Sequence, residues 1–282
     1  MGFIGTVWGR ARRTWARDEL SPSQAVVYDR LRDLFAAGEY EKAEAGARAL
    51  AAAPSHVWDR GPVVEWLAKS LATAAAVAHG RGAEVLAELD GLIADLERTT
   101  GAGRALLLTV RGNRVAVLVG QRRYTEAEAE ASDILRASAR LAHLTEVWRI
   151  ELSALANLAD ALCGQGRYEE AGAIARGNLP RAEGRTAAAL HCVLVRSLNG
   201  HGRHEEALAE TRRLMSYRVR AESGALGIAT ATALHGLGRR SEAEGAARQA
   251  LAACEQFLHP AHPWIEEART LLCRITAERP PA

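Results

Sequence analysis

Apolar residues recur along this chain at the spacing of one face of an α-helix. In the stretch 152–163 these residues are Leu152, Leu155, Leu158, Ala159 and Leu162. The spacing predicts an amphipathic helix, and Gly164 and Gly166 end it, because glycine accepts the left-handed conformation that closes a helix. A second apolar stripe runs through 168–178 and stops at Pro180. Together the two stripes predict an antiparallel helix hairpin.

The same pattern predicts six hairpins in the chain. The expected helix pairs are 22–37 with 40–52, 61–79 with 83–99, 104–120 with 124–140, 145–163 with 168–178, 185–199 with 204–216, and 221–236 with 240–256. A last helix near 262–277 has no partner after it. We expect this helix to cap the C-terminal end of a stack of hairpins.

The motif Gly-x-aromatic-x-x-Ala separates the two helices of each pair. Its copies lie at 38–43, 166–171 and 202–207, the last with His204 as the ring. Partial copies lie at 238–243, where Arg240 replaces the ring, and at 122–127 and 80–85. The ring positions 40, 82, 124, 168, 204 and 240 are 42, 42, 44, 36 and 36 residues apart. Such a period is typical of stacked repeats. We expect the Gly to make the chain reversal, the Ala to let two helices cross closely, and the ring to fill the gap toward the next repeat.

With these residues the chain resembles the tetratricopeptide repeat (TPR) superfamily over roughly residues 22–277. The unit 152–180 matches best, and the long early steps and the linker 258–263 resemble the kinesin-light-chain-like repeats of bacterial proteins. The unit 61–99 departs from the pattern, with Gly82 in place of the ring and Val85 in place of the Ala. The resemblance implies an all-α, right-handed superhelix of about six hairpins with a C-terminal capping helix. We assign residues 22–279 to it.

The resemblance implies that the first helix of each pair lines a concave groove, and that this groove binds a peptide. Asn113 and Asn157 are equivalent, since each lies 11 residues before its ring position at 124 or 168. The resemblance implies that an Asn in this place contacts the peptide backbone. The other polar residues expected on this face are Arg111, Asp160, Arg196, Asn199 and His235. The alternative is that these are ordinary solvated side chains of a helix surface.

The amino-acid composition limits the kinds of core, binding partner and location that the chain can have. Aromatic residues make up 5% of the chain and hydrophobic residues 48%, so Ala and Leu must do most of the packing. The net charge of +2 comes from Arg and Glu that are interleaved, whereas a nucleic-acid binder shows a basic stripe. Lysine occurs only twice, at Lys42 and Lys69, and this bias toward Arg indicates a GC-rich bacterial source. No apolar run approaches the length of a membrane span.

The four cysteines are expected to be reduced, buried residues of a cytoplasmic protein. They are Cys163, Cys192, Cys254 and Cys273, which are far apart and form no C-x-x-C pair. The pairs His201/His204 and His259/His262 lack further ligands at the spacing of a metal site. We find no phosphate-binding Gly loop and no H-E-x-x-H or G-x-S-x-G motif. The sequence therefore predicts no metal, no cofactor and no enzyme activity.

Residues 1–21 form a separate basic segment. Phe3, Trp8 and Trp15 fall on one side of a helical wheel, and arginines fall on the other. This is the pattern of a basic amphipathic helix. Residues 1–17 have three possible roles: covering the open end of the stack, docking a partner protein, or lying on an anionic membrane surface.

The function that fits these features best is a non-catalytic scaffold or adaptor that holds a peptide segment of a partner protein in the concave groove. One alternative is a regulatory protein that senses a peptide or metabolite and acts through a partner. Another is a peripheral membrane organiser that uses residues 1–17. The sequence leaves the oligomeric state open.

Overall fold

The computed structural model of the protein describes residues 20–53, 62–100, 102–141, 147–214 and 223–277. The segment 1–17 lies outside the described residues, so its three possible roles stay predictions.

Helices dominate the described part of the chain, which contains no strand. They are α3 (Pro22–Ala36), α4 (Tyr40–Ala52), α5 (Val63–His79), α6 (Gly82–Glu97), α7 (Ala102–Gly120), α8 (Tyr124–Arg140), α9 (Val147–Gly164), α10 (Tyr168–Asn178), a 3₁₀ turn η1 (Leu179–Arg181), α11 (Gly184–Gly200), α12 (His204–Leu214), α13 (Ser223–Gly236), α14 (Arg240–Phe257) and α15 (Pro263–Ala277). Each α-helix lies within about two residues of the helix that the apolar pattern predicts, whereas the turn η1 was not predicted.

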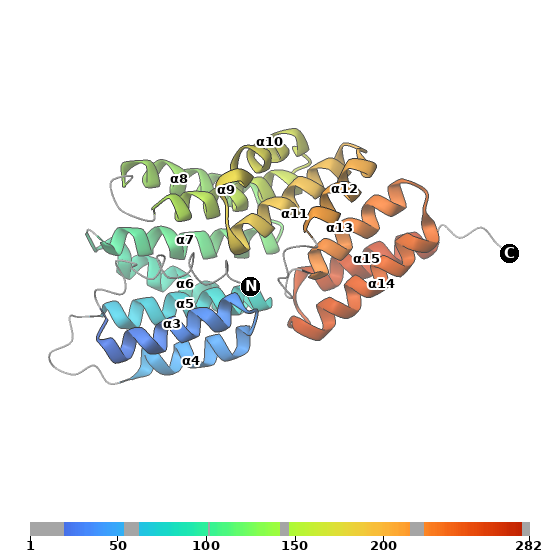
Figure 1. Ribbon diagram of the computed structural model, residues 1–282. Coiled ribbons are helices and arrows are strands. Elements are labelled where there is room, and N and C mark those ends of the chain that lie inside the picture. Colours follow the sequence, from blue (N-terminus) through green and yellow to red (C-terminus); the bar gives the residue numbers. More distant parts are fainter. Residues whose placement is uncertain (1–19, 54–61, 101, 142–146, 215–222, 278–282) are drawn as a thin grey trace, which may run out of the picture.

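The helices stack in chain order, and each packs against the next (Figure 1). The first helices of successive pairs also contact each other, from α3 through α5, α7, α9, α11 and α13 to α15. The second helices of successive pairs make far fewer contacts with one another. The stack therefore curves with the first helices on its inner side. This arrangement confirms the predicted all-α solenoid, and α15 covers α13 and α14 as the expected cap.

A ring of one repeat packs on a glycine of the next. A Cβ added to Gly164 on α9 would overlap the ring of Tyr124 on α8. Gly200 on α11 meets the ring of Tyr168 in the same way, and Gly236 meets the imidazole of His204. Any larger residue at these glycines would push the two repeats apart. The predicted role of the ring, filling the gap toward the next repeat, is confirmed.

The other motif positions also behave as the pattern predicts. The motif alanines are fully buried where the helices cross; they are Ala43, Ala127, Ala171, Ala207 and Ala243. The motif glycines before them adopt positive φ, as at Gly166 with φ 78°. In the one repeat that has lost its glycine, Arg122 takes this conformation with φ 61°. A side chain in this region strains the backbone.

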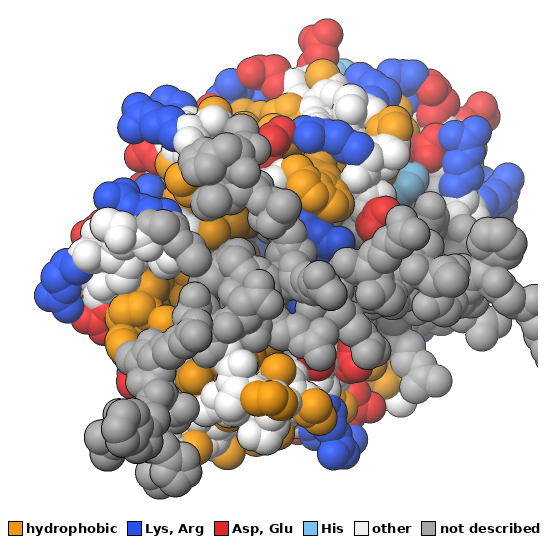
Figure 2. Space-filling view, turned by 60° about the vertical axis from the view of Figure 1, so that its left-hand side comes forward, with side chains coloured by type: hydrophobic (Ala, Val, Ile, Leu, Met, Phe, Trp, Pro, Cys, Tyr) orange, Lys and Arg blue, Asp and Glu red, His pale blue; other side chains and the backbone are white. Residues whose placement is uncertain are grey.

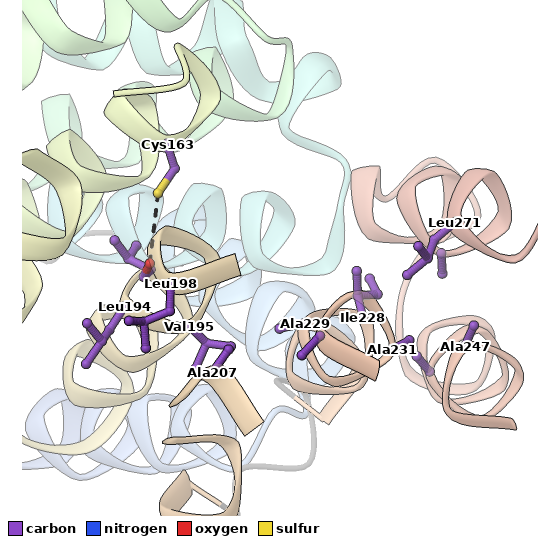
Figure 3. Packing of buried hydrophobic residues seen from close by; sticks show 14 of the residues in the cluster. Cys163, Leu194, Val195, Leu198, Ala207, Ile228, Ala229, Ala231, Ala247 and Leu271 are labelled. Carbon is purple, nitrogen blue, oxygen red and sulfur yellow. Dashed lines mark hydrogen bonds between the residues drawn. The ribbon is translucent and has the colours of Figure 1, made fainter. Parts of the chain in front are cut away.

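Small side chains also fill the largest core cluster, which runs from α9 to α15 and includes Tyr40 of α4 (Figure 3). Ala231 of α13 and Ala247 of α14 lie between these two helices, and both are fully buried. Cys163 is buried in the same cluster, with its Sγ 3.9 Å from the carbonyl oxygen of Val193. Cys254 is buried too, but Cys192 is only half-buried and Cys273 is exposed. The prediction of buried cysteines is therefore wrong for Cys273, because none of the described helices packs over its side of α15.

The described surface is mixed in charge. A repeated pair joins the arginine before each ring position to a glutamate three residues later; these pairs are Arg123–Glu126, Arg167–Glu170, Arg203–Glu206 and Arg239–Glu242. Figure 2 shows basic side chains beside acidic ones around the described part of one face. Exposed pairs of this kind stabilise a protein only slightly.

The stack does not stay open along its length. The guanidinium of Arg185, at the start of α11, donates to the Oη of the buried Tyr40 at 2.5 Å and lies 4.6 Å from the ring centroid of Phe35. The backbone N–H of His259 donates to the carbonyl oxygen of His79 at 2.9 Å.

Further close contacts lie beside these two bonds. A Cβ at Gly80 would lie 2.7 Å from the Cβ of His262, and one at Gly120 would lie 3.5 Å from Pro263. We call this set of contacts the seam: Phe35, Tyr40, His79, Gly80, Gly120, Arg185, His259, His262 and Pro263. The seam joins repeats that are not neighbours in the sequence.

Replacing Arg122 by glycine is expected to stabilise the protein by about 0.5–1 kcal/mol, because glycine adopts φ 61° without steric strain. The melting temperature should rise by roughly 2 °C for a chain of this size. Gly166→Ala, which creates the same strain in a complete motif, should lower it. A lower melting temperature for Arg122→Gly, measured by circular dichroism, would show that the arginine side chain contributes more than the strain costs.

Acid is expected to weaken the seam. Burial, with a smaller effect of His79, lowers the pKa of His262 to about 4. Its Nδ1 also accepts the backbone N–H of Trp264 at 3.1 Å, which protonation of this nitrogen would prevent. Since the folded-state pKa lies below the unfolded value of 6.5, the neutral ring contributes stability above pH 6.5, and this is lost as the pH falls toward 4. The loss amounts to about 3 kcal/mol.

The matched variant is His262→Asn, whose side-chain oxygen still accepts the N–H of Trp264 but does not titrate. Urea unfolding between pH 7 and pH 4 should show a shallower loss of stability in this variant than in the unmodified protein. His201→Asn, at an exposed histidine outside the seam, is the control substitution. Equal slopes for His262→Asn and the unmodified protein would contradict the assignment.

Candidate functional site

The inner side of the stack carries a row of polar residues on α7, α9 and α11. Asn113 and Asn157 lie on adjacent first helices, and both are half-buried. The Nδ2 of Asn113 donates to the carbonyl oxygen of Ser70 at 3.4 Å, and that of Asn157 donates to Gly112 at 3.0 Å. Each amide therefore links its own helix to the preceding first helix. No donor from the described ranges bonds the side-chain oxygen of Asn113 or Asn157.

Asp160 and Arg196 also hold equivalent places, each eight residues before its ring position at 168 or 204. The two side chains form an ion pair between α9 and α11, and they are 34% and 36% exposed. Asp160 raises the pKa of the Arg196 guanidinium above its ordinary value, and the exposed Glu267 of α15 adds to this effect. Arg196 is thus a cation paired with Asp160, and it stays partly exposed to solvent.

Asn199 and His235 continue the row toward the C-terminus. The Nδ2 of Asn199 donates to the carbonyl oxygen of Ala229 on α13 at 2.9 Å, and its Oδ1 lies 3.2 Å from the Nδ1 of His204. Asn199 therefore links α11 to α13. His235 occupies the equivalent position on α13 and is half-buried.

Arg111 does not join the row. Its Nε donates to Glu130 on α8 at 3.2 Å, and Arg114 bonds the same carboxylate and Asp90. The structure therefore directs Arg111 toward the second helix of its own pair. The structure brings together the predicted residues on α7, α9 and α11, which are Asn113, Asn157, Asp160, Arg196 and Asn199. Their contact with a ligand stays a prediction.

A cavity of about 190 Å³ lies beside Asn113, between α7 and α9. It is lined by Leu108, Thr109, Gly112, Asn113, Ile134, Arg149, Ile150, Ser153 and Ala154. Sequence reasoning found only Asn113 among these. Thr109 and Ser153 could have been found, because each lies one helical turn before Asn113 or Asn157 and so shares its face. Ile134 could not, because it comes from the second helix α8.

A second cavity, of about 510 Å³, lies at the seam. Its charged walls are already paired, since the buried Glu44 binds both Arg48 and Arg81. Within the described ranges, no group of three or more His, Cys, Asp or Glu residues is arranged to hold a metal ion. None of the described helices is long and apolar enough to cross a membrane.

The fold and the polar inner row define a class of protein: a helical-repeat solenoid of TPR-like hairpins. The ring, alanine and positive-φ positions that carried the resemblance all hold the places that such repeats require.

Comparison with known proteins supports this class at the level of the fold. No protein-family profile matches the chain, and no curated protein sequence is similar to it. A solved structure, that of a Rap protein complexed with competence and sporulation factor, is similar, with a TM-score of 0.66. The similarity covers 92% of this chain and 72% of the Rap chain, at 17% sequence identity. The chain therefore has the fold of a TPR-like α-solenoid.

Asn157→Ala is expected to lower the free energy of unfolding by about 1 kcal/mol, because it removes the 3.0 Å bond between α9 and α7. Asn113→Ala, which removes a longer bond of 3.4 Å, should cost less. Urea unfolding measures both values. An unchanged free energy for Asn157→Ala would mean that its amide does not hold the helices together.

Proposed function

We propose that the protein is a non-catalytic scaffold or adaptor that binds a peptide segment of a partner protein along the inner side of its stack. The observation that carries the proposal is the polar row of Asn113, Asn157, Asp160 and Arg196 on three consecutive first helices, beside a cavity. Evenly spaced polar groups on a curved inner surface suit a chain with a regular backbone.

The row offers two kinds of contact. The side-chain oxygens of Asn113 and Asn157 can accept the N–H groups of an extended peptide, while their amide donors stay bonded to the helices. Arg196 and Asp160 can bind charged side chains of the peptide by charge-assisted hydrogen bonds. The existing ion pair fixes both groups before the peptide arrives, which reduces the entropy lost on binding.

The chemistry of the buried thiols supports a non-catalytic role. Burial raises the pKa of Cys163 to about 12 and that of Cys254 to about 11. Neither is a thiolate nucleophile at neutral pH. All four cysteines are free thiols, which supports a reducing, cytoplasmic setting. The structurally similar Rap protein was solved in a complex with competence and sporulation factor, and this supports a binding role for the shared fold.

The seam supports a second candidate, a regulatory protein that senses a peptide or metabolite. A ligand between α7, α9 and α11 can alter the spacing of these first helices. The seam contains residues of α7 and α11 and bonds α11 to α4, so its contacts depend on this spacing. The contacts of the seam would then differ between the free protein and the protein with a ligand in its groove.

Arg196→Gln is the direct test of the groove. Peptides selected from a random library displayed on phage against the full chain should bind this variant about tenfold more weakly, because one charge-assisted hydrogen bond is lost. The matched control is Arg248→Gln on α14, where Arg248 is 64% exposed and pairs with Glu244 of the same helix. Isothermal titration measures both affinities. Equal affinities for the two variants would overturn the proposed function.

The double variant Asp160→Arg, Arg196→Asp tests the orientation of the bound peptide. It keeps an ion pair between α9 and α11 but reverses its direction. Peptides selected against it should therefore carry the opposite order of charges. The same charge order with both proteins would exclude contact with this pair.

A further inference from the structure

The cavity between α7 and α9 is too small to enclose a whole small molecule. Its volume of about 190 Å³ lies below the roughly 300–1,000 Å³ of sites that enclose a small molecule. It can hold one side chain, and it lies directly beside Asn113 in the polar row.

The walls of the cavity select an aliphatic side chain. Leu108, Ile134 and Ala154 are almost fully buried, and Ile150 is half-buried beside them. The hydroxyl of Thr109 at the rim already donates to the carbonyl oxygen of Ala105 at 3.0 Å. A polar side chain placed among these apolar walls would lose its hydrogen bonds to water.

The residues that line the cavity include one cation, Arg149. Arg149 lines the cavity, and its guanidinium lies 4.9 Å from the centroid of the Trp148 ring, which is itself 40% exposed. No carboxylate from the described ranges forms an ion pair with Arg149. The ring of Trp148 holds the guanidinium of Arg149 beside the cavity. A ligand carboxylate next to the aliphatic side chain would form a charge-assisted hydrogen bond with this guanidinium.

Gly112 leaves open space beside the cavity. A Cβ at this position would meet nothing within 4 Å, although Gly112 lies in the middle of α7. Glycine in a helix interior costs about 1 kcal/mol relative to alanine. A side chain added at Gly112 would enter the open space beside the cavity, whose lining includes Gly112.

We propose that this cavity is the anchor pocket for one branched aliphatic residue of the bound peptide, and that Arg149 binds a carboxylate directly beside this residue. The inference rests on the proposed function and specifies its ligand: an extended segment in which a residue such as leucine adjoins an acidic group.

The test uses the full chain with methyl-labelled isoleucines, observed by NMR. The chain has eight isoleucines, of which Ile134 and Ile150 line the cavity and the others serve as internal controls. The probe is N-acetyl-leucine, which carries the aliphatic side chain and a carboxylate in one residue. N-acetyl-alanine keeps the charge with a smaller side chain, and N-acetyl-leucinamide keeps the side chain without the charge.

N-acetyl-leucine is expected to shift the methyl signals of Ile134 and Ile150 in a saturable way. N-acetyl-alanine should bind at least tenfold more weakly, because most of the buried apolar area is lost. N-acetyl-leucinamide should bind about two- to fivefold more weakly in the unmodified protein. It should bind as well as N-acetyl-leucine in Arg149→Gln. Shifts spread over all isoleucines, or no shifts, would overturn the inference.

Gly112→Leu separates the pocket from the fold. The new side chain enters open space and favours the helix, so the melting temperature should not fall. The response of Ile134 and Ile150 to N-acetyl-leucine should disappear. Unchanged binding in this variant would overturn the inference.

The phage selection described above separates the two proposals. Selected peptides that depend on Arg196 but show no aliphatic preference, or keep one in Gly112→Leu, would leave the proposed function standing and overturn the anchor pocket. Failure to select any peptide dependent on Arg196 would overturn both.

Discussion

The contact between a ring and a glycine of the next repeat is the constraint on which the structure depends. Tyr124 against Gly164 and Tyr168 against Gly200 fix how closely successive first helices approach. This distance decides whether Asn157 can reach Gly112 and whether Arg196 can reach Asp160. The polar row on the inner side is therefore a product of the packing in the core. A change in one ring would displace residues that never touch it.

One of the two repeats without a ring explains part of the seam. Gly82 stands where the ring should be, and Val117 of the next first helix packs directly against it. Gly120, the counterpart of Gly164 and Gly200, therefore receives no ring from the preceding repeat. Pro263 of the C-terminal linker lies there instead, 3.5 Å from the position of its missing Cβ. The departure from the motif at Gly82 therefore gives the linker before α15 a place to dock.

The sequence predicted what depends on local pattern. Helix bounds, the motif alanines and the equivalence of Asn113 with Asn157 all follow from spacing along the chain, and the structure keeps them. It did not predict the direction of Arg111, because the competing carboxylate of Glu130 lies on another helix. Nor did it predict the bond between Arg185 and Tyr40, since the two residues are 145 positions apart and belong to different repeats. The anchor pocket was missed for the same reason: Ile134, its floor, comes from a helix of the outer layer.

Arg185 bonded to Tyr40 changes how the molecule should fold. A linear array of repeats gains stability one interface at a time, and its ends can fray independently. A bond across 145 residues closes a large loop, whose entropic cost must be met before the contact forms. Together with the bond from His259 to His79, this contact makes the terminal repeats share one cooperative transition with the middle of the chain. The high sequence separation of both contacts slows folding. Shortening the array from either end would therefore weaken the whole molecule rather than remove a single layer.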